Sequence, residues 1–172
     1  MKVEINVIAT VIVFVFGVLV WIANDFVKRH VPMTAFGVLI ACFFANASVL
    51  LPSSSILIAI EYSMVINPIA VAFFGAVGSA LGEMIGFQVG RCGRNIVPRK
   101  IYKWLENRMK SHGYTMVFLF AVIPLPFFDL IGMLSGVMRM NAIKFYSVCF
   151  IGKLIKLTGY IWLAYTVTTL LG

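Results

Sequence analysis

The chain has 172 residues, of which 62% are hydrophobic and only 12% are charged. Soluble domains carry about 25% charged residues, because their surfaces face water. This composition excludes an ordinary soluble domain and predicts a single integral membrane domain, residues 1–172, with lipid as its solvent. The net charge of +8 is the basic surplus that membrane proteins place on their cytoplasmic side, and no signature of nucleic-acid binding accompanies it.

The first apolar run, Ile5 to Ala23, is long enough to cross a bilayer. No cleavage pattern of small residues follows it, so we expect a retained transmembrane helix rather than a signal peptide. A short polar loop comes next, and the helix and loop together take up residues 1–33.

The next apolar run, Thr34 to Ile60, is interrupted in its middle by the segment Leu50 to Ser55. Pro52 removes a backbone hydrogen-bond donor there, and the serines offer side-chain partners. Broken backbone at membrane depth is tolerated where it is packed in protein or lies beside water. We interpret the run as a re-entrant hairpin that enters and leaves on one side, with a kinked full span as the alternative.

A helix is expected from Pro68 to Gly90, and it completes a first hairpin-plus-helix unit over residues 34–90. Its glycines recur at a spacing of four, which lets helix backbones approach closely in lipid. They are Gly78, Gly82, Gly86 and Gly90. Glu83 lies beside them. An ionisable group within a span is costly unless it is protonated, paired or hydrated, so Glu83 is a candidate functional residue.

Residues 91–112 carry seven of the fourteen basic residues and a single acid. Their apolar residues recur at helical spacing, which predicts an amphipathic helix lying on an anionic cytoplasmic leaflet. The alternative is a topology signal without a specific ligand.

A second unit is expected over residues 113–172. Its interrupted run, Tyr114 to Val137, breaks at Pro124 and Pro126, and Asp129 lies just beyond the break.

The last helix is predicted from Ala142 to Leu170. It carries Lys153 and Lys156 about 16–21 Å from its start, near the middle of the bilayer. Tyr160 shares their face, because the three residues are spaced i, i+3 and i+7. The helix therefore presents two amines and a phenol too deep for easy contact with either surface.

Sliding the sequence against itself by 74 residues superposes the two interrupted runs. The matches are Leu51-Pro52 with Leu125-Pro126, Asn67 with Asn141, Ile69 with Ile143 and Gly78 with Gly152. They include the helix breaker, the start of the following helix and a glycine within it. The sequence thus contains two hairpin-plus-helix units.

Each hairpin returns to its own side, so a single crossing separates the two units and the second unit is expected to be inverted. The predicted fold class is an all-α polytopic membrane protein. It has an N-terminal transmembrane helix and an inverted repeat of two re-entrant helical hairpins, each followed by a transmembrane helix. With the N-terminus and residues 91–112 cytoplasmic, the first hairpin enters from outside and the second from inside. Many secondary transporters build their substrate sites from such inverted repeats.

Two segments resemble a known family. Residues Gly82 to Arg91, GEMIGFQVGR, resemble the signature of acid, glycines and arginine in DedA proteins, whose family includes the VTT, or SNARE-associated Golgi protein, domain. The second half is similar in Pro126 to Gly132, PFFDLIG, and in Gly136, Arg139, Phe145 and Gly152-Lys153. The resemblance covers about residues 34–170. It implies two opposed re-entrant hairpins and the movement of lipids between leaflets, polyprenyl phosphate in bacterial members and phospholipids in eukaryotic ones.

The chain departs from that family pattern at the charges. DedA proteins usually carry carboxylates in the first hairpin, whereas this chain has Asn46 and the serines 53–55. They also carry arginines around the second break, and here no arginine lies between Lys110 and Arg139. The deep cations have moved to the last helix.

We therefore expect a transporter or scramblase that moves a phosphate-bearing lipid between leaflets, with coupling to a proton or another ion left open. Lysine is a compact charge that binds phosphate. The candidate substrate-binding residues are Lys153, Lys156, Arg139, Tyr160 and Ser54. Glu83 and Asp129 are candidates for proton coupling or charge pairing, and Pro52, Pro124 and Pro126 mark the hairpin tips.

Two other functions remain as alternatives: a structural or partner-binding membrane protein, and an exporter of a small molecule or ion. No motif of a metalloprotease or serine hydrolase is present, so an enzyme is not expected, nor a cofactor or metal. The three cysteines are interpreted as small apolar residues rather than as a disulfide. Membrane lipids are the expected partners, a homo-oligomer is left open, and the resemblance implies the plasma membrane of a prokaryote.

Overall fold

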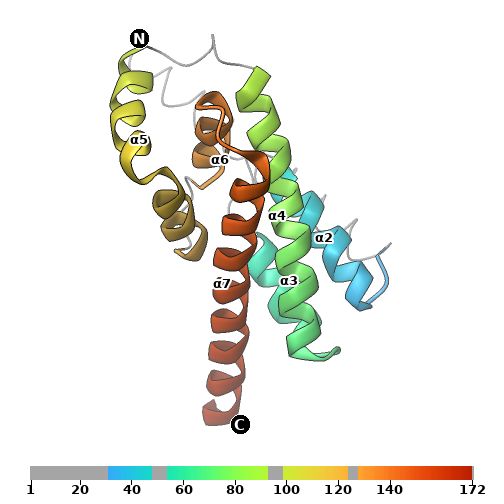
Figure 1. The fold of residues 1–172 in the computed structure, drawn as a ribbon. Coiled ribbons are helices and arrows are strands. Elements are labelled where there is room, and N and C mark those ends of the chain that lie inside the picture. Colours follow the sequence, from blue (N-terminus) through green and yellow to red (C-terminus); the bar gives the residue numbers. More distant parts are fainter. Residues whose placement is uncertain (1–30, 48–53, 93–98, 124–127, 172) are drawn as a thin grey trace, which may run out of the picture. The chain divides into compact units, whose positions relative to one another are not determined.

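Helices account for all the regular structure in the residues that a computed structural model describes, which are 31–47, 54–92, 99–123 and 128–171. In chain order they are α2 Ala35–Ala47, α3 Ser54–Ser63, α4 Pro68–Cys92, α5 Arg99–Val122, α6 Phe128–Val137 and α7 Ala142–Leu171 (Figure 1). All of them belong to one unit, residues 33–172. The helix predicted before residue 24 lies outside the described residues and stays a prediction.

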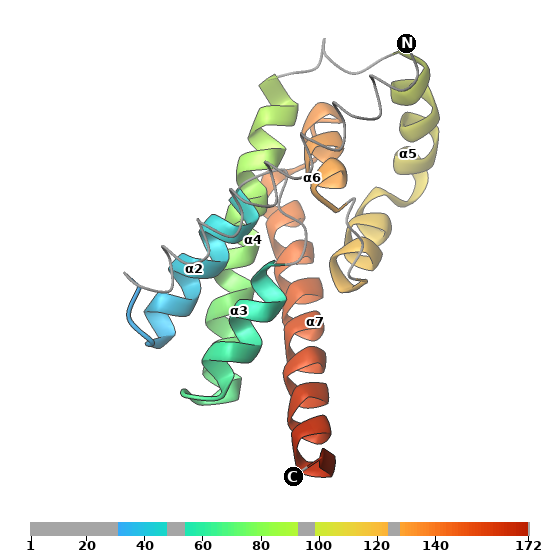
Figure 2. The same cartoon turned by 180° about the vertical axis from the view of Figure 1, so that it is seen from behind.

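Two helices, α4 and α7, are long and apolar enough to cross a membrane. They lie side by side in both views (Figure 1, Figure 2). Their contacts run in opposite directions along the two chains. The ring of Phe87 in α4 stacks on Phe145 in α7 at 4.8 Å, whereas Gly75 lies against Leu157. The two helices are therefore antiparallel.

The glycines of α4 make its interfaces close ones. A Cβ atom on Gly78 would meet the backbone carbonyl of Leu39 in α2, and one on Gly90 would meet the carbonyl of Met133 in α6. The reverse contact is present as well, because a Cβ atom on Gly136 of α6 would meet the carbonyl of Phe87. Backbone thus packs directly on backbone on two sides of α4, as the glycine spacing predicts.

The first interrupted run forms two separate helices that contact each other, α2 and α3. The Cys42 thiol donates to the Ser55 carbonyl at 3.9 Å. In a continuous helix these residues, thirteen apart, would lie ~20 Å from each other. The two arms therefore fold back against each other. The break itself, with Pro52, lies outside the described residues.

The two units have matching helix bounds. A shift of 74 residues maps α3 onto α6 from end to end, and maps the first residue of α4, Pro68, onto the first residue of α7, Ala142. The residue before each long helix is an asparagine whose side-chain oxygen accepts a backbone N–H, from Ile69 at Asn67 and from Ile143 at Asn141. Asparagine is a favoured N-cap because its short side chain satisfies a donor that the first turn leaves open.

The second unit differs from the prediction at its start. The basic segment and the first arm of the second run were expected as separate elements that meet at residue 112. In the structure they form one helix, α5, with a kink at His112, where φ is −141° and ψ is 30°. Since no proline interrupts residues 99–122, the hydrogen-bonded ladder continues on both sides of the kink.

Candidate functional site

Lys153 of α7 and Glu83 of α4 form an ion pair in the middle of the contact between the two long helices. The Lys153 Nζ atom lies 2.6 Å from Glu83 Oε1. The lysine side chain is 1% exposed and the glutamate side chain 3% exposed. Two charges removed from water this completely are expensive, and their attraction offsets that cost only when the geometry is good and further hydrogen bonds are made.

Asn46 of α2 supplies such hydrogen bonds. Its Oδ1 atom accepts a hydrogen bond from Lys153 Nζ at 2.5 Å, and its Nδ2 atom donates to Ser79 Oγ at 3.1 Å. The same amide also donates to the Cys42 carbonyl, one turn earlier in α2, at 2.8 Å. Asn46, Ser79, Glu83 and Lys153 thus join α2, α4 and α7, and we call these four residues the polar network.

Apolar layers enclose the polar network along the helix axes. One turn beyond Glu83, the Phe87 ring stacks on Phe145, and both rings are fully buried. One turn beyond Lys153, Leu157 is 1% exposed and packs toward Gly75. The pair therefore lies in a low-dielectric interior, where both the attraction between its charges and the cost of separating them are larger than in water.

Space beside the carboxylate comes from α6. A Cβ atom on Gly132 would lie 3.3 Å from Glu83 Oε2, so the absence of a side chain there leaves room for the second carboxylate oxygen. A lysine ammonium held by a carboxylate and an amide oxygen is an anion site whose place is taken by the protein's own anion. Such a site can bind an external phosphate only after Glu83 releases it.

The other predicted site residues on α7 lie further along the helix. Lys156 and Tyr160 are both half-buried, three and seven residues beyond Lys153. Arg139 is exposed in the turn before α7, with a left-handed φ of 53°. Because Lys153 lies eleven residues into α7, ~16 Å along its axis, the structure does not bring Arg139 to the polar network.

Several predicted site residues are outside what the structure describes. Pro52, Pro124 and Pro126 lie in undescribed segments, and the side chains of Ser54 in α3 and Asp129 in α6 are not described. Their roles, including the pairing of Asp129 with a lysine, stay predictions. Among the described residues, no group of three or more His, Cys, Asp or Glu side chains could hold a metal ion.

Asn46 and Ser79 were not predicted as site residues. Neither carries a charge, and Asn46 is 107 residues from Lys153 in the sequence. A signal was nevertheless present, because Asn46 is the one strongly polar side chain in the apolar stretch Ala35–Ala47. An amide at such a position needs a buried partner.

The fold and the polar network define an all-helical membrane protein with two antiparallel candidate spans that share a buried ion pair. The family follows from a family model, the VTT domain, which matches residues 51–166. The chain belongs to the VTT domain family, which confirms the resemblance found in the sequence. The match runs from the first break to the second half of α7 and includes three residues of the polar network. No curated protein and no solved structure matches the chain.

Proposed function

We propose that this protein moves a phosphate-bearing lipid, either polyprenyl phosphate or a phospholipid, from one membrane leaflet to the other. The observation that carries the proposal is the buried ammonium of Lys153 between the two candidate spans. An ionised group at this depth costs free energy, and such groups in membrane proteins mark the paths of ions and polar groups. Membership of a membrane-associated family agrees with this role.

Lys153 is the proposed contact for the lipid phosphate, and Glu83 occupies its place when no lipid is bound. Lipid binding then requires the carboxylate to leave the ammonium, either by accepting a proton or by a separation of α4 from α7. Glu83 is thus the proposed link between proton uptake and transport. Lys156 and Tyr160 continue the polar face of α7, and Asp129 is the second proposed carboxylate on this path.

The proposed topology is an inverted repeat of two re-entrant hairpins. The shift of 74 residues that relates α4 to α7 also reverses their direction, because the two helices are antiparallel. The fold-back of α2 against α3 supports a hairpin that returns to its own side. The N-terminus and residues 91–112 are then cytoplasmic, and on the resemblance to bacterial DedA proteins we propose the plasma membrane of a prokaryote.

Single cysteines in a cysteine-free chain test this topology. Thr34→Cys and Val65→Cys flank the first hairpin at exposed positions, and Arg91→Cys lies exposed at the far end of α4. We expect membrane-impermeant reagents to label the first two from one side and Arg91→Cys from the other. Labelling of Thr34→Cys and Val65→Cys from opposite sides would contradict the hairpin and favour a full span.

A leaflet-exchange assay on reconstituted protein tests the proposed function. Labelled polyprenyl phosphate and labelled phospholipid are compared in separate vesicles. Wild type should exchange one of them, and Lys153→Met should slow that exchange at least about tenfold, the factor that corresponds to ~1.4 kcal/mol of lost interaction. Methionine keeps the chain length and removes the charge.

Lys144→Met is the matched control, because Lys144 is an exposed lysine at the start of the same helix. It should exchange lipid as wild type does. If Lys153→Met and Lys156→Met combined in one chain leave exchange unchanged, the assignment of the site is wrong. If wild type exchanges neither lipid, the proposed function is wrong.

The near-complete burial of the ion pair favours one second candidate, a structural membrane protein in which the pair only joins α2, α4 and α7. In that case the Lys153→Met chain loses stability but there is no exchange to lose. Measuring melting temperature in detergent on the same proteins separates the two functions.

A further inference from the structure

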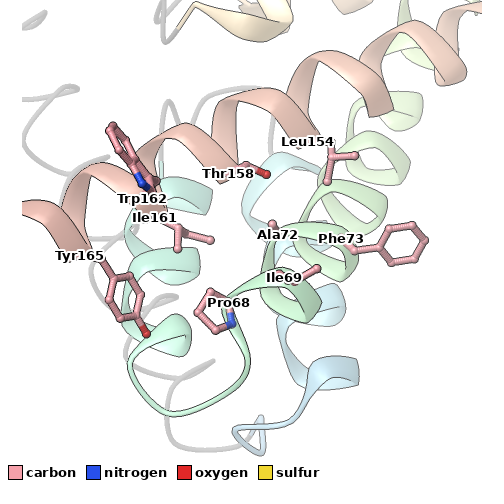
Figure 3. Close-up of a pocket in the computed structure, with 9 residues that line it drawn as sticks. All are labelled: Pro68, Ile69, Ala72, Phe73, Leu154, Thr158, Ile161, Trp162 and Tyr165. Carbon is pink, nitrogen blue, oxygen red and sulfur yellow. The ribbon is translucent and has the colours of Figure 1, made fainter.

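An apolar groove lies on the same two helices, beyond the polar network. It has a volume of about 540 Å³ and lies between the first two turns of α4, from Pro68 to Phe73, and the stretch of α7 from Leu154 to Tyr165 (Figure 3). None of its lining residues is charged. Its lining therefore matches an occupant without charge.

The groove opens where the helices face lipid. Ile69 on the α4 wall is 80% exposed and Trp162 on the α7 wall is 70% exposed. Both walls belong to the helices that are long and apolar enough to cross a membrane. Exposed apolar side chains on such helices are surrounded by hydrocarbon, so the groove continues directly into the acyl-chain region of the bilayer.

The length of the groove matches one leaflet. From Leu154 to Tyr165 the helix rises ~16 Å, about half of the ~30 Å hydrocarbon core. The groove begins one residue beyond Lys153. The two side chains point in directions ~100° apart around the helix axis. The lysine therefore faces the polar network, while Leu154 faces the groove.

We propose that this groove binds one hydrocarbon chain of the transported lipid while its phosphate is at the level of Lys153. This inference rests on the proposed function and adds a tail site to it. A headgroup in the middle of the bilayer leaves its tail within one leaflet, and a groove of one leaflet's length beside the cation accommodates that tail. The shared chemistry of the occupant is a hydrocarbon chain, which an acyl chain or a prenyl chain supplies.

Thr158 offers a way to fill the groove without disturbing the core. It lines the groove and is exposed, so Thr158→Phe places a ring in the groove. Ile155→Phe is the matched control, because Ile155 is 50% exposed on the same helix and does not line the groove. Trp162→Ala removes one wall at a largely exposed position and serves as a second variant if Thr158→Phe does not fold.

Lipid retention is measured by native mass spectrometry of detergent-purified protein, after titration with polyprenyl phosphate in one arm and phospholipid in the other. Wild type and Ile155→Phe should bind one lipid with equal affinity, while Thr158→Phe and Trp162→Ala should bind about tenfold more weakly. The arm that shows retention identifies the chain. Equal retention by all four proteins would overturn the tail site.

A second measurement reports the occupant directly. With Trp21→Phe and Trp104→Phe, Trp162 becomes the single tryptophan of the chain. Lipids brominated on their chains should quench its fluorescence, and Thr158→Phe should weaken that quenching more than Ile155→Phe. Absence of quenching would mean that protein covers the groove, which overturns the proposal. If retention and quenching behave as expected but wild type exchanges no lipid, the tail site stands and the proposed function fails.

Discussion

The two long helices occupy equivalent places in the repeat but differ in their surroundings. The helix α4 is enclosed by α2, α6 and α7, and its glycines bring backbone against backbone. The helix α7 presents large apolar side chains outward along much of its length, among them Ile151, Ile155 and Leu163. The comparison indicates that α4 fixes the positions of its neighbours, while α7 carries the cation at the boundary with lipid.

The same comparison locates the charge on one side of an otherwise matched interface. A shift of 74 residues maps Ser79 onto Lys153 and Glu83 onto Leu157. All four side chains are buried between α4 and α7. One equivalent pair of positions therefore holds an ion pair and the other holds a hydroxyl and an apolar side chain. This asymmetry teaches that the polar site arose from a difference between the units.

The largest expected effect comes from removing one member of the ion pair. Glu83→Leu leaves the Lys153 charge buried without its carboxylate, and the free energy of unfolding should fall by ~3–5 kcal/mol. The double change Glu83→Leu with Lys153→Met should recover most of that loss, because no buried charge remains. Melting temperatures in detergent measure both.

Leaflet exchange on the same proteins sharpens the result. The double variant should be stable and inactive if Lys153 binds the lipid. An unchanged melting temperature in Glu83→Leu would mean that the carboxylate does not hold the ammonium, and the comparison of charged and apolar halves would lose its basis.

A smaller effect is expected from the glycines, and it should differ in sign between the two helices. Gly78→Ala in α4 places a methyl group against the Leu39 carbonyl, so the helices must separate, at a cost of ~1–3 kcal/mol. At Gly159 in α7 nothing lies within 4 Å, and Gly159→Ala should raise stability by up to ~1 kcal/mol through helix propensity. Melting temperatures that change in the same direction in both variants would contradict the different roles of α4 and α7.

The smallest effect concerns the caps. Asn67 accepts one backbone N–H at the start of α4, whereas Asn141 accepts two, from Ile143 and Lys144, at the start of α7. Asn67→Ala should cost ~1 kcal/mol, and Asn141→Ala somewhat more. Hydrogen exchange of the first-turn amides measures the difference, and equal protection in both variants would remove this distinction between the helices.

The sequence predicted the long helices well because their ends carry local signals. Both begin directly after an asparagine, at Pro68 and Ala142 as expected, and α4 extends two residues past its predicted end at Gly90. The boundary expected at residue 112 is instead a kink. Ser111-His112-Gly113 loses the apolar pattern but contains no residue that forbids helix, so hydropathy and backbone geometry separate there.

The candidate site was only partly predictable. Lys153 and Glu83 stand out in any apolar run because ionised groups are costly there. The sequence left two partners open for the lysine, Glu83 and Asp129, and the structure shows the contact with Glu83. Asn46 acquires its role only through the packing of α2 on α4. A contact between residues 107 apart leaves no local signal.

The buried cysteines give the chain a built-in reporter of its own opening. Cys42 precedes Asn46 by one helical turn and Cys149 precedes Lys153 by one turn, and both thiols are fully buried, whereas Cys92 is exposed. An alkylating reagent should therefore modify Cys92 at once and the other two only when α2, α4 and α7 separate. The ratio of slow to fast modification, followed in the unaltered protein, counts how often the interior is exposed.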